Sequence, residues 1–215
     1  MRLIGEEYSE EKFGGMLLLQ YTILNDGKPR KRAKNRKRSE EDETADGKKE
    51  EKEEKEEEME LDLERCRRFF EDGVIKDWST CDWFSIRVLG RYIKLRGASI
   101  GRSIADWADS ENLWCRRAAG ISFINLAKNG DENWEGFCKL VLGVCEKTVK
   151  CEERFAQTGT GWVVRELGVA ERKMAVEFLE RNVGIMSKEG VRYATEKMGD
   201  GERKRLLKLW EEEKR

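Results

Sequence analysis

Apolar residues recur at the three-to-four-residue spacing of amphipathic helices from Leu61 almost to the end of the chain. Short clusters of Gly, Asn, Asp and Ser separate these stretches. The expected helices are Leu61–Gly73, Thr80–Leu95, Ala98–Ala108, Asn112–Ala127, Asn133–Thr148, Glu152–Leu167, Val169–Asn182, Ser187–Met198 and Glu202–Glu213. Helices of similar length joined by a few residues favour stacked antiparallel pairs. We therefore expect an all-α protein, an α-solenoid of HEAT-like helix pairs without a fixed-period sequence repeat.

The pattern changes abruptly at Asn25-Asp26-Gly27. Before it, Ser9 and the following EEKFGGMLLLQYTIL predict an amphipathic helix with Ser9 as its N-cap. After it, Glu, Lys and Arg dominate, and such a segment cannot bury enough surface to offset its ordering entropy. The expected parts are residues 1–27 as an N-terminal helix of the repeat domain, residues 28–60 as a disordered charged linker, and residues 61–215 as the helical repeat domain.

Composition agrees with a helical protein, because charged residues make up 40% of the 215 and proline occurs once. The net charge of −1 hides a segregation. The part after the linker carries an excess of roughly three positive charges, which permits a nucleic-acid partner without requiring one. The cationic run from Lys28 to Arg38 resembles a nuclear localisation signal, so we expect a nuclear protein. The alternative is that this run is a solvated linker without a localisation signal, in a cytoplasmic protein.

Several classes of site are excluded or disfavoured by composition. The chain has no histidine, which excludes a His-dependent triad, a His-ligated zinc and an imidazole acid or base. Its six cysteines form no CxxC pair, so we expect reduced thiols in an intracellular protein and no metal or other cofactor. The longest apolar run, Met16 to Leu24, is too short to span a bilayer. We expect a soluble monomer with no membrane partner.

Three stretches on separate predicted helices carry the candidate chemistry: DWSTCDW (Asp77 to Trp83), ENLWCRRAAG (Glu111 to Gly120) and RFAQTGTGWVVREL (Arg154 to Leu167). Trp78 and Asp82 stand one helical turn apart. Each also has a purely structural interpretation, Trp78 as a staple beside a helix start and Asp82 as a carboxylate in the first turn. Gly159 and Gly161 each cost about 1 kcal/mol relative to alanine inside a helix, so another helix or a ligand must approach there closely.

In this order and spacing the stretches resemble those of the DNA alkylation repair family, the AlkD-type DNA glycosylases built from HEAT-like repeats. The matching features are Trp78 with Asp82, then NLWCRRAAG with Arg117 as its arginine, then QTGTGWVVRE. Further on, SKEGVRYATEKM resembles the family's tail, and EEYSEEKFGGMLLL resembles its early helix. The resemblance covers residues 5–24 and 61–207.

The resemblance implies a glycosylase that releases purines alkylated at N3 or N7, which are cationic and therefore leave readily. As the glycosidic bond stretches, the deoxyribose acquires oxocarbenium character. By this resemblance Asp82 stabilises that cation and positions the attacking water, while Trp78 and Trp162 form aromatic walls. The family engages the lesion through the DNA backbone, without the deep base flipping of most base-modifying enzymes. The implied partner is double-stranded DNA that carries alkylated bases.

By the same resemblance Arg117 holds a backbone phosphate near the lesion, and further candidate phosphate contacts are Arg116, Lys150 and Arg154. The acidic part of the linker and the small basic excess depart from what DNA binding favours. Three alternatives remain open from sequence. The chain could be a pseudoenzyme, a non-catalytic DNA-binding repeat protein, or a protein scaffold in which Trp78 and Trp162 are core residues.

Overall fold

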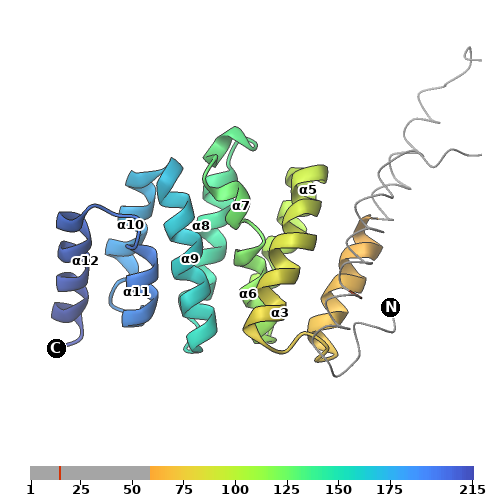
Figure 1. Ribbon diagram of the computed structural model, residues 1–215, viewed down its shortest axis with the longest axis horizontal. Coiled ribbons are helices and arrows are strands. Elements are labelled where there is room, and N and C mark those ends of the chain that lie inside the picture. The colour runs from red at the N-terminus through yellow and green to blue at the C-terminus, as the bar shows by residue number, and fades with distance from the viewer. Residues whose placement is uncertain (1–14, 16–58) are drawn as a thin grey trace, which may run out of the picture.

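The computed structural model describes Gly15 and residues 59–215 of the chain (Figure 1). Within that part every regular element is a helix, so the predicted all-α class is confirmed. Gly15 is helical and buried. The remainder of the helix predicted around Ser9, and the linker with its basic run from Lys28 to Arg38, lie outside the described residues.

A first helix occupies residues 59–71. The elements after it are α3 (Trp78–Phe84), the π-helix η2 (Ser85–Leu89), α4 (Gly90–Arg96), α5 (Ala98–Ala105), the 3-10 turn η3 (Asp106–Asp109), α6 (Leu113–Ile121), α7 (Ile124–Ala127), the 3-10 turn η4 (Gly130–Glu132), α8 (Phe137–Thr148), α9 (Arg154–Ala170), α10 (Arg172–Asn182), α11 (Lys188–Ala194) and α12 (Asp200–Glu213).

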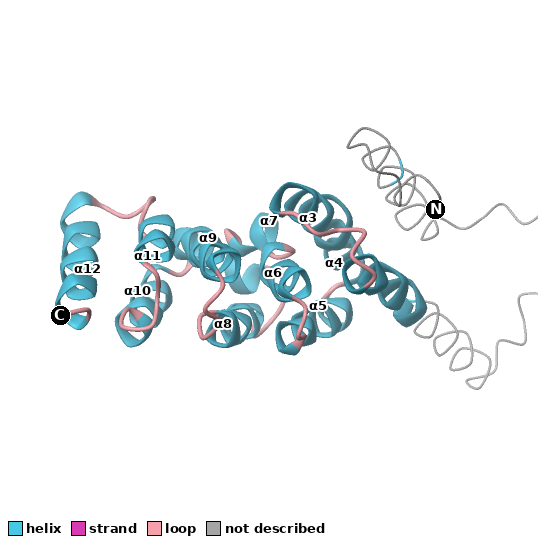
Figure 2. Cartoon of the chain, turned by 90° about the horizontal axis from the view of Figure 1, so that it is seen from below, coloured by secondary structure: helices cyan, strands magenta, loops and turns pink. Residues whose placement is uncertain are grey.

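The helices lie side by side along the long axis of the molecule, with the helix of residues 59–71 at one end and α12 at the other (Figure 1). Each of α3, α6, α9 and α11 packs against the next in that series, while α5, α8 and α10 lie on the other side of the molecule (Figure 2). The last helix, α12, packs on both α10 and α11. The helices α3, α6 and α9, which are far apart in sequence, thereby become neighbours.

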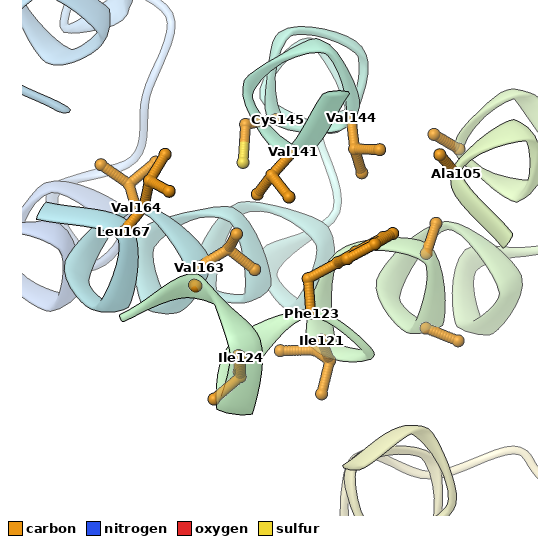
Figure 3. Packing of buried hydrophobic residues seen from close by; sticks show 14 of the residues in the cluster. Ala105, Ile121, Phe123, Ile124, Val141, Val144, Cys145, Val163, Val164 and Leu167 are labelled. Carbon is orange, nitrogen blue, oxygen red and sulfur yellow. The ribbon is translucent and has the colours of Figure 1, made fainter. Parts of the chain in front are cut away.

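Aliphatic side chains fill the space between the two sides. Val141 of α8 and Val163 of α9 point toward one another near Phe123, while Val164 lies beside Leu167 on α9 (Figure 3). These side chains are completely excluded from solvent. Their burial is the main stabilising contribution to the stack of helices.

Side-chain caps fix where two of the site-bearing helices begin. Asp77 accepts hydrogen bonds from the backbone N–H groups of Ser79 and Thr80, both at 3.0 Å, so α3 begins at Trp78. Asn112 caps α6 in the same way. The cap corrects two expectations: Trp78 is the first residue of the helix and does not precede it, and Asp82 lies beyond the first turn.

Other differences from the sequence prediction have local causes. The helix expected over residues 112–127 breaks between α6 and α7, where the Ser122 hydroxyl donates to the Ala118 carbonyl at 2.6 Å and competes with the backbone ladder. The helix expected from Asn133 begins only at Phe137, after Gly136 adopts a left-handed φ of 81°. A glycine can adopt this φ without strain.

The glycines in α9 have the close neighbours that the sequence required. A Cβ atom added to Gly161 would lie 2.3 Å from the Gly190 carbonyl oxygen and 3.0 Å from Cβ of Tyr193. What approaches Gly161 is therefore the helix α11, which lies directly on α9. The third stretch and the SKEGVRYATEKM tail are the two halves of one helix-helix contact.

Gly161→Ala should therefore lower the free energy of unfolding by about 2–3 kcal/mol, because the backbone of α11 cannot retreat without losing its packing. The matched control is Gly143→Ala in α8, where an added Cβ meets no atom within 4 Å. This control should stabilise the protein by up to about 1 kcal/mol through helix propensity. Urea denaturation of both variants measures the difference, and a Gly161→Ala variant as stable as the control would contradict the close contact.

Candidate functional site

A buried ion pair joins the first two of the three stretches. Arg117 of α6 donates from Nε to Oδ1 of Asp82 at 2.7 Å and from Nη2 to Oδ2 at 2.8 Å. Asp82 is 8% exposed and Arg117 is 7% exposed. This bidentate arrangement is the strongest geometry for an arginine and a carboxylate.

The same guanidinium reaches the third stretch. Its Nη1 donates to the Phe155 carbonyl oxygen at 2.6 Å and lies 3.4 Å from Oγ1 of Thr158, both in α9. A Cβ at Gly159 would lie 3.1 Å from this Nη1. Gly159 therefore leaves room for Arg117, as Gly161 leaves room for α11. One buried side chain thus links α3, α6 and α9.

The two tryptophans differ in burial. Trp78 is 55% exposed although it begins a helix, so its interpretation as a staple or as a core residue is wrong. Trp162 is partly buried and packs against the core, with the guanidinium carbon of Arg165 5.7 Å from the centre of its ring. Trp162 therefore has a packing role that Trp78 lacks.

The structure adds aromatic neighbours that the sequence did not single out. The rings of Trp114 and Phe155 lie with their centroids 5.4 Å apart. The guanidinium carbons of Arg117 and Arg154 lie 6.0 Å and 5.4 Å from the centre of the Phe155 ring. Nothing in the local sequence indicates this arrangement, because Phe155 meets Arg117 only through the packing of α9 on α6.

Three of the four predicted phosphate contacts are engaged within the protein. Arg117 holds Asp82, as above. Arg116 donates from Nη1 to the carbonyl oxygens of Ser110 and Glu111, both at 2.7 Å, and from Nη2 to Glu153. Arg154 forms two hydrogen bonds of 2.7 Å with Glu189, and these bonds raise the pKa of Arg154.

Lys150, the fourth, lies apart from this group. It is exposed in the connection between α8 and α9, where it lines a pocket of ≈ 570 Å³ with Ile185 and Trp210 among its other walls. The structure thus brings Trp78, Asp82, Arg117 and Trp162 onto three neighbouring helices and leaves Lys150 outside. The phosphate-binding roles of all four cations stay predictions.

Gln157, the first residue of the QTGTGWVVRE stretch, forms hydrogen bonds with two connections, the one between α8 and α9 and the one between α10 and α11. Its Nε2 donates to the carbonyl oxygens of Val149 and Cys151 at 2.8 Å and 2.9 Å, and its Oε1 accepts from the Ser187 backbone N–H at 2.9 Å. The residue is buried. Its amide therefore satisfies backbone groups that would otherwise be buried without partners.

Glu166, which closes the same stretch, joins α9 to the chain after α11. It accepts from Lys197 at 2.6 Å and from Arg165 at 3.0 Å. Burial opposes its ionisation, but the hydrogen bonds and charges of Lys197 and Arg165 outweigh burial and lower the pKa of Glu166 below its ordinary value of 4.5.

The thiol next to Asp82 is unsuited to nucleophilic chemistry. Burial is the main cause that raises the pKa of Cys81, and the Asp82 charge adds to it. Burial also raises the pKa of Cys115 in α6. Both therefore stay protonated and serve as small apolar groups. Across the described residues, no group of three or more Cys, Asp or Glu side chains is placed to hold a metal ion, and no helix is long and apolar enough to cross a membrane.

The lowered pKa of Glu166 predicts a pH dependence. Its ion pairs contribute stability above about pH 4.5, and that contribution is lost as the pH falls through the lowered folded-state pKa. Glu166→Gln should therefore be less stable than the wild type at pH 7, with the difference closing below pH 4.5. Urea denaturation at several pH values measures this, with Glu135→Gln, an exposed position, as control. A difference that stays constant with pH would contradict the assignment.

Comparison with known proteins identifies one family. A family model described as DNA alkylation repair enzyme matches residues 41–198, which is well over half of the chain and contains Trp78, Asp82, Arg117 and Trp162. The match begins inside the segment predicted as a linker. No curated protein and no solved structure matches significantly. The chain belongs to the DNA alkylation repair enzyme family.

Proposed function

We propose that the protein is a DNA glycosylase that hydrolyses the N-glycosidic bond of cationic N3- or N7-alkylated purines. The observation that carries this proposal is the Asp82 carboxylate, which two hydrogen bonds from Arg117 hold in place one helical turn from the exposed ring of Trp78. The membership in a DNA repair family supports it.

The geometry of Asp82 suits a group that stabilises a cation. A carboxylate has about four lone-pair sites, and Arg117 takes one on each oxygen. The side chain retains 12% of its exposure, so an edge of the charged group remains accessible to a sugar or a water. When the bond to the purine stretches, the positive charge moves from the base to the deoxyribose, and a fixed carboxylate stabilises it there.

The aromatic rings supply a second contribution. Trp78 lies on α3 one turn before Asp82, and its exposed face is available to a cationic base or sugar. Trp162 lies on α9, whose first turns hold the guanidinium of Arg117. We assign both rings to the walls around the reacting nucleotide. The alkylated purine already carries a positive charge and departs as a neutral base, so no strong general acid is required. Water then adds to the cationic sugar and loses a proton to solvent.

In this proposal the protein engages the lesion through the DNA backbone, as the family resemblance implies, and the damaged base stays in the duplex instead of swinging into a deep pocket. In this proposal the row of α3, α6, α9 and α11 is the DNA-facing side of a HEAT-like solenoid.

Release of 7-methylguanine from a methylated duplex at low salt, measured under single-turnover conditions, tests the proposal. Asp82→Asn should slow release by about 100-fold or more, because it removes the charge that stabilises the transition state. Trp78→Ala should slow it by about tenfold through the loss of a cation–π contact. If the wild type binds the duplex and releases no base, the glycosylase assignment is wrong.

Folding must be separated from chemistry in this experiment. Asp82→Asn leaves Arg117 buried without its carboxylate, which costs about 3–5 kcal/mol of stability, so thermal melting must accompany each rate. Trp78→Ala avoids this problem because the ring is mostly exposed. Leu95→Ala, also exposed and on the same continuous helix, is its matched control. Equal effects of these two variants on base release would remove Trp78 from the site.

One observation favours a second function. Arg117 neutralises Asp82 so completely that the pair can serve as a purely structural link between α3 and α6. The protein would then be a DNA-binding module without catalysis. That function predicts duplex binding with a steep salt dependence and no release of base.

A further inference from the structure

A second polar surface lies on the elements that follow the two helices of the ion pair in the chain, α4 after α3 and α7 after α6. It is a pocket of ≈ 470 Å³ between α4 and the segment from α7 to η4. Its lining consists of three cations, three asparagines and three apolar residues: Arg91, Lys94, Lys128, Asn125, Asn129, Asn133, Ile86, Gly90 and Leu126. No carboxylate lines it.

The cations of this pocket differ from those near Asp82. Arg116, Arg117 and Arg154 all donate to carboxylates. Arg91 and Lys94, in contrast, are exposed and form no ion pair within residues 59–215. Lys128 is likewise exposed and unpaired in that range. Three positive charges that converge on one pocket without a counter-charge attract an anion.

The walls of the pocket are fixed before any ligand binds. Asn133 donates from Nδ2 to the carbonyl oxygens of Leu126 and Gly130 at 2.9 Å and 2.7 Å, which holds the connection after α7. On the other side, a Cβ at Gly90 would lie 2.7 Å from the Ser122 carbonyl oxygen. This close approach sets the spacing of the two helices beside the pocket. Lys128 and Arg91 are therefore presented from two fixed walls.

The pocket lies at a fixed distance from the ion pair along one continuous run of helix. α3, η2 and α4 run continuously, so Arg91 and Lys94 lie roughly 13–18 Å along the helix from Asp82. Lys128 lines the same pocket from the neighbouring segment, just after α7. Phosphates on one DNA strand advance by about 3.4 Å per nucleotide along the duplex axis. For a duplex that runs along α3 and α4, the pocket is thus a few nucleotides away from a lesion placed at Asp82.

We propose that the pocket formed by Arg91, Lys94 and Lys128, with the amides of Asn125 and Asn129, binds a phosphate of the DNA backbone. This phosphate lies a few nucleotides from the damaged nucleotide at Asp82. The placement of that DNA rests on the proposed function. Arginine and lysine supply the charge, and the asparagine amides add neutral donors to the phosphate oxygens. The contact is independent of base sequence, so it holds a duplex whether or not a lesion is present.

Binding of the full chain to an undamaged duplex across a series of salt concentrations tests this contact. The variant Arg91→Ala/Lys128→Ala should reduce the slope of log K against log salt by about 2, or about 1 for each lost cation. The control, Arg102→Ala/Lys139→Ala, removes the same charge from exposed positions on α5 and α8. It should leave the slope unchanged. Equal slopes for the two variants, or no binding by the wild type at low salt, would overturn the proposal.

Inorganic phosphate separates a DNA contact from a site for a small anion. Phosphate and chloride are compared at equal ionic strength by their effect on the melting temperature of the wild type and of Arg91→Ala/Lys128→Ala. If phosphate stabilises only the wild type and the DNA slope is the same in both proteins, the pocket holds a free anion and the DNA contact is refuted. If the salt slope of DNA binding falls as expected in Arg91→Ala/Lys128→Ala while the wild type releases no base, the phosphate contact is supported and the glycosylase assignment is wrong.

Discussion

The bidentate pair between Asp82 and Arg117 is the interaction on which the arrangement of the site depends. Each charge is buried, and each would be costly without the other. Because Arg117 also donates to the Phe155 carbonyl oxygen, the pair fixes α3, α6 and α9 relative to one another. The groups that hold the Asp82 carboxylate in place are thus the same groups that hold the three helices together. A change at either residue affects the site and the packing at once.

Close backbone contacts make this arrangement possible. Gly159 leaves space for the Arg117 guanidinium, and Gly161 lets α11 lie against α9. The amide of Gln157 and the ion pairs of Glu166 then fasten the two ends of that helix contact. The QTGTGWVVRE stretch therefore acts mainly as a structural support. Its contact with the ion pair is the Thr158 hydroxyl, 3.4 Å from Nη1 of Arg117, and in our proposal its functional contribution is the ring of Trp162.

The sequence predicted the helices and the candidate residues but not their partners. Periodicity and the cost of two helical glycines follow from local chemistry, so the all-helical class and the close contact at α9 were predictable. Salt-bridge partners depend on which helices become neighbours. Arg116 and Arg154 looked like free cations in the sequence, and only the packing brings Glu153 and Glu189 to them. The exposure of Trp78 also depends on the exact helix start, which the Asp77 cap sets.

The distribution of paired and unpaired cations has a consequence for DNA binding. A guanidinium that is already bonded to a carboxylate adds little net charge. The positive potential that attracts DNA therefore receives only a small contribution from Arg116, Arg117 and Arg154. Arg91, Lys94 and Lys128 keep their full charge at a pocket away from the ion pair. In our proposal the two tasks are separated in space. The cations of the pocket hold the duplex, and the ion-paired carboxylate of Asp82, fixed in place by Arg117, meets the sugar. A small basic excess is then sufficient, because it is concentrated where phosphates pass.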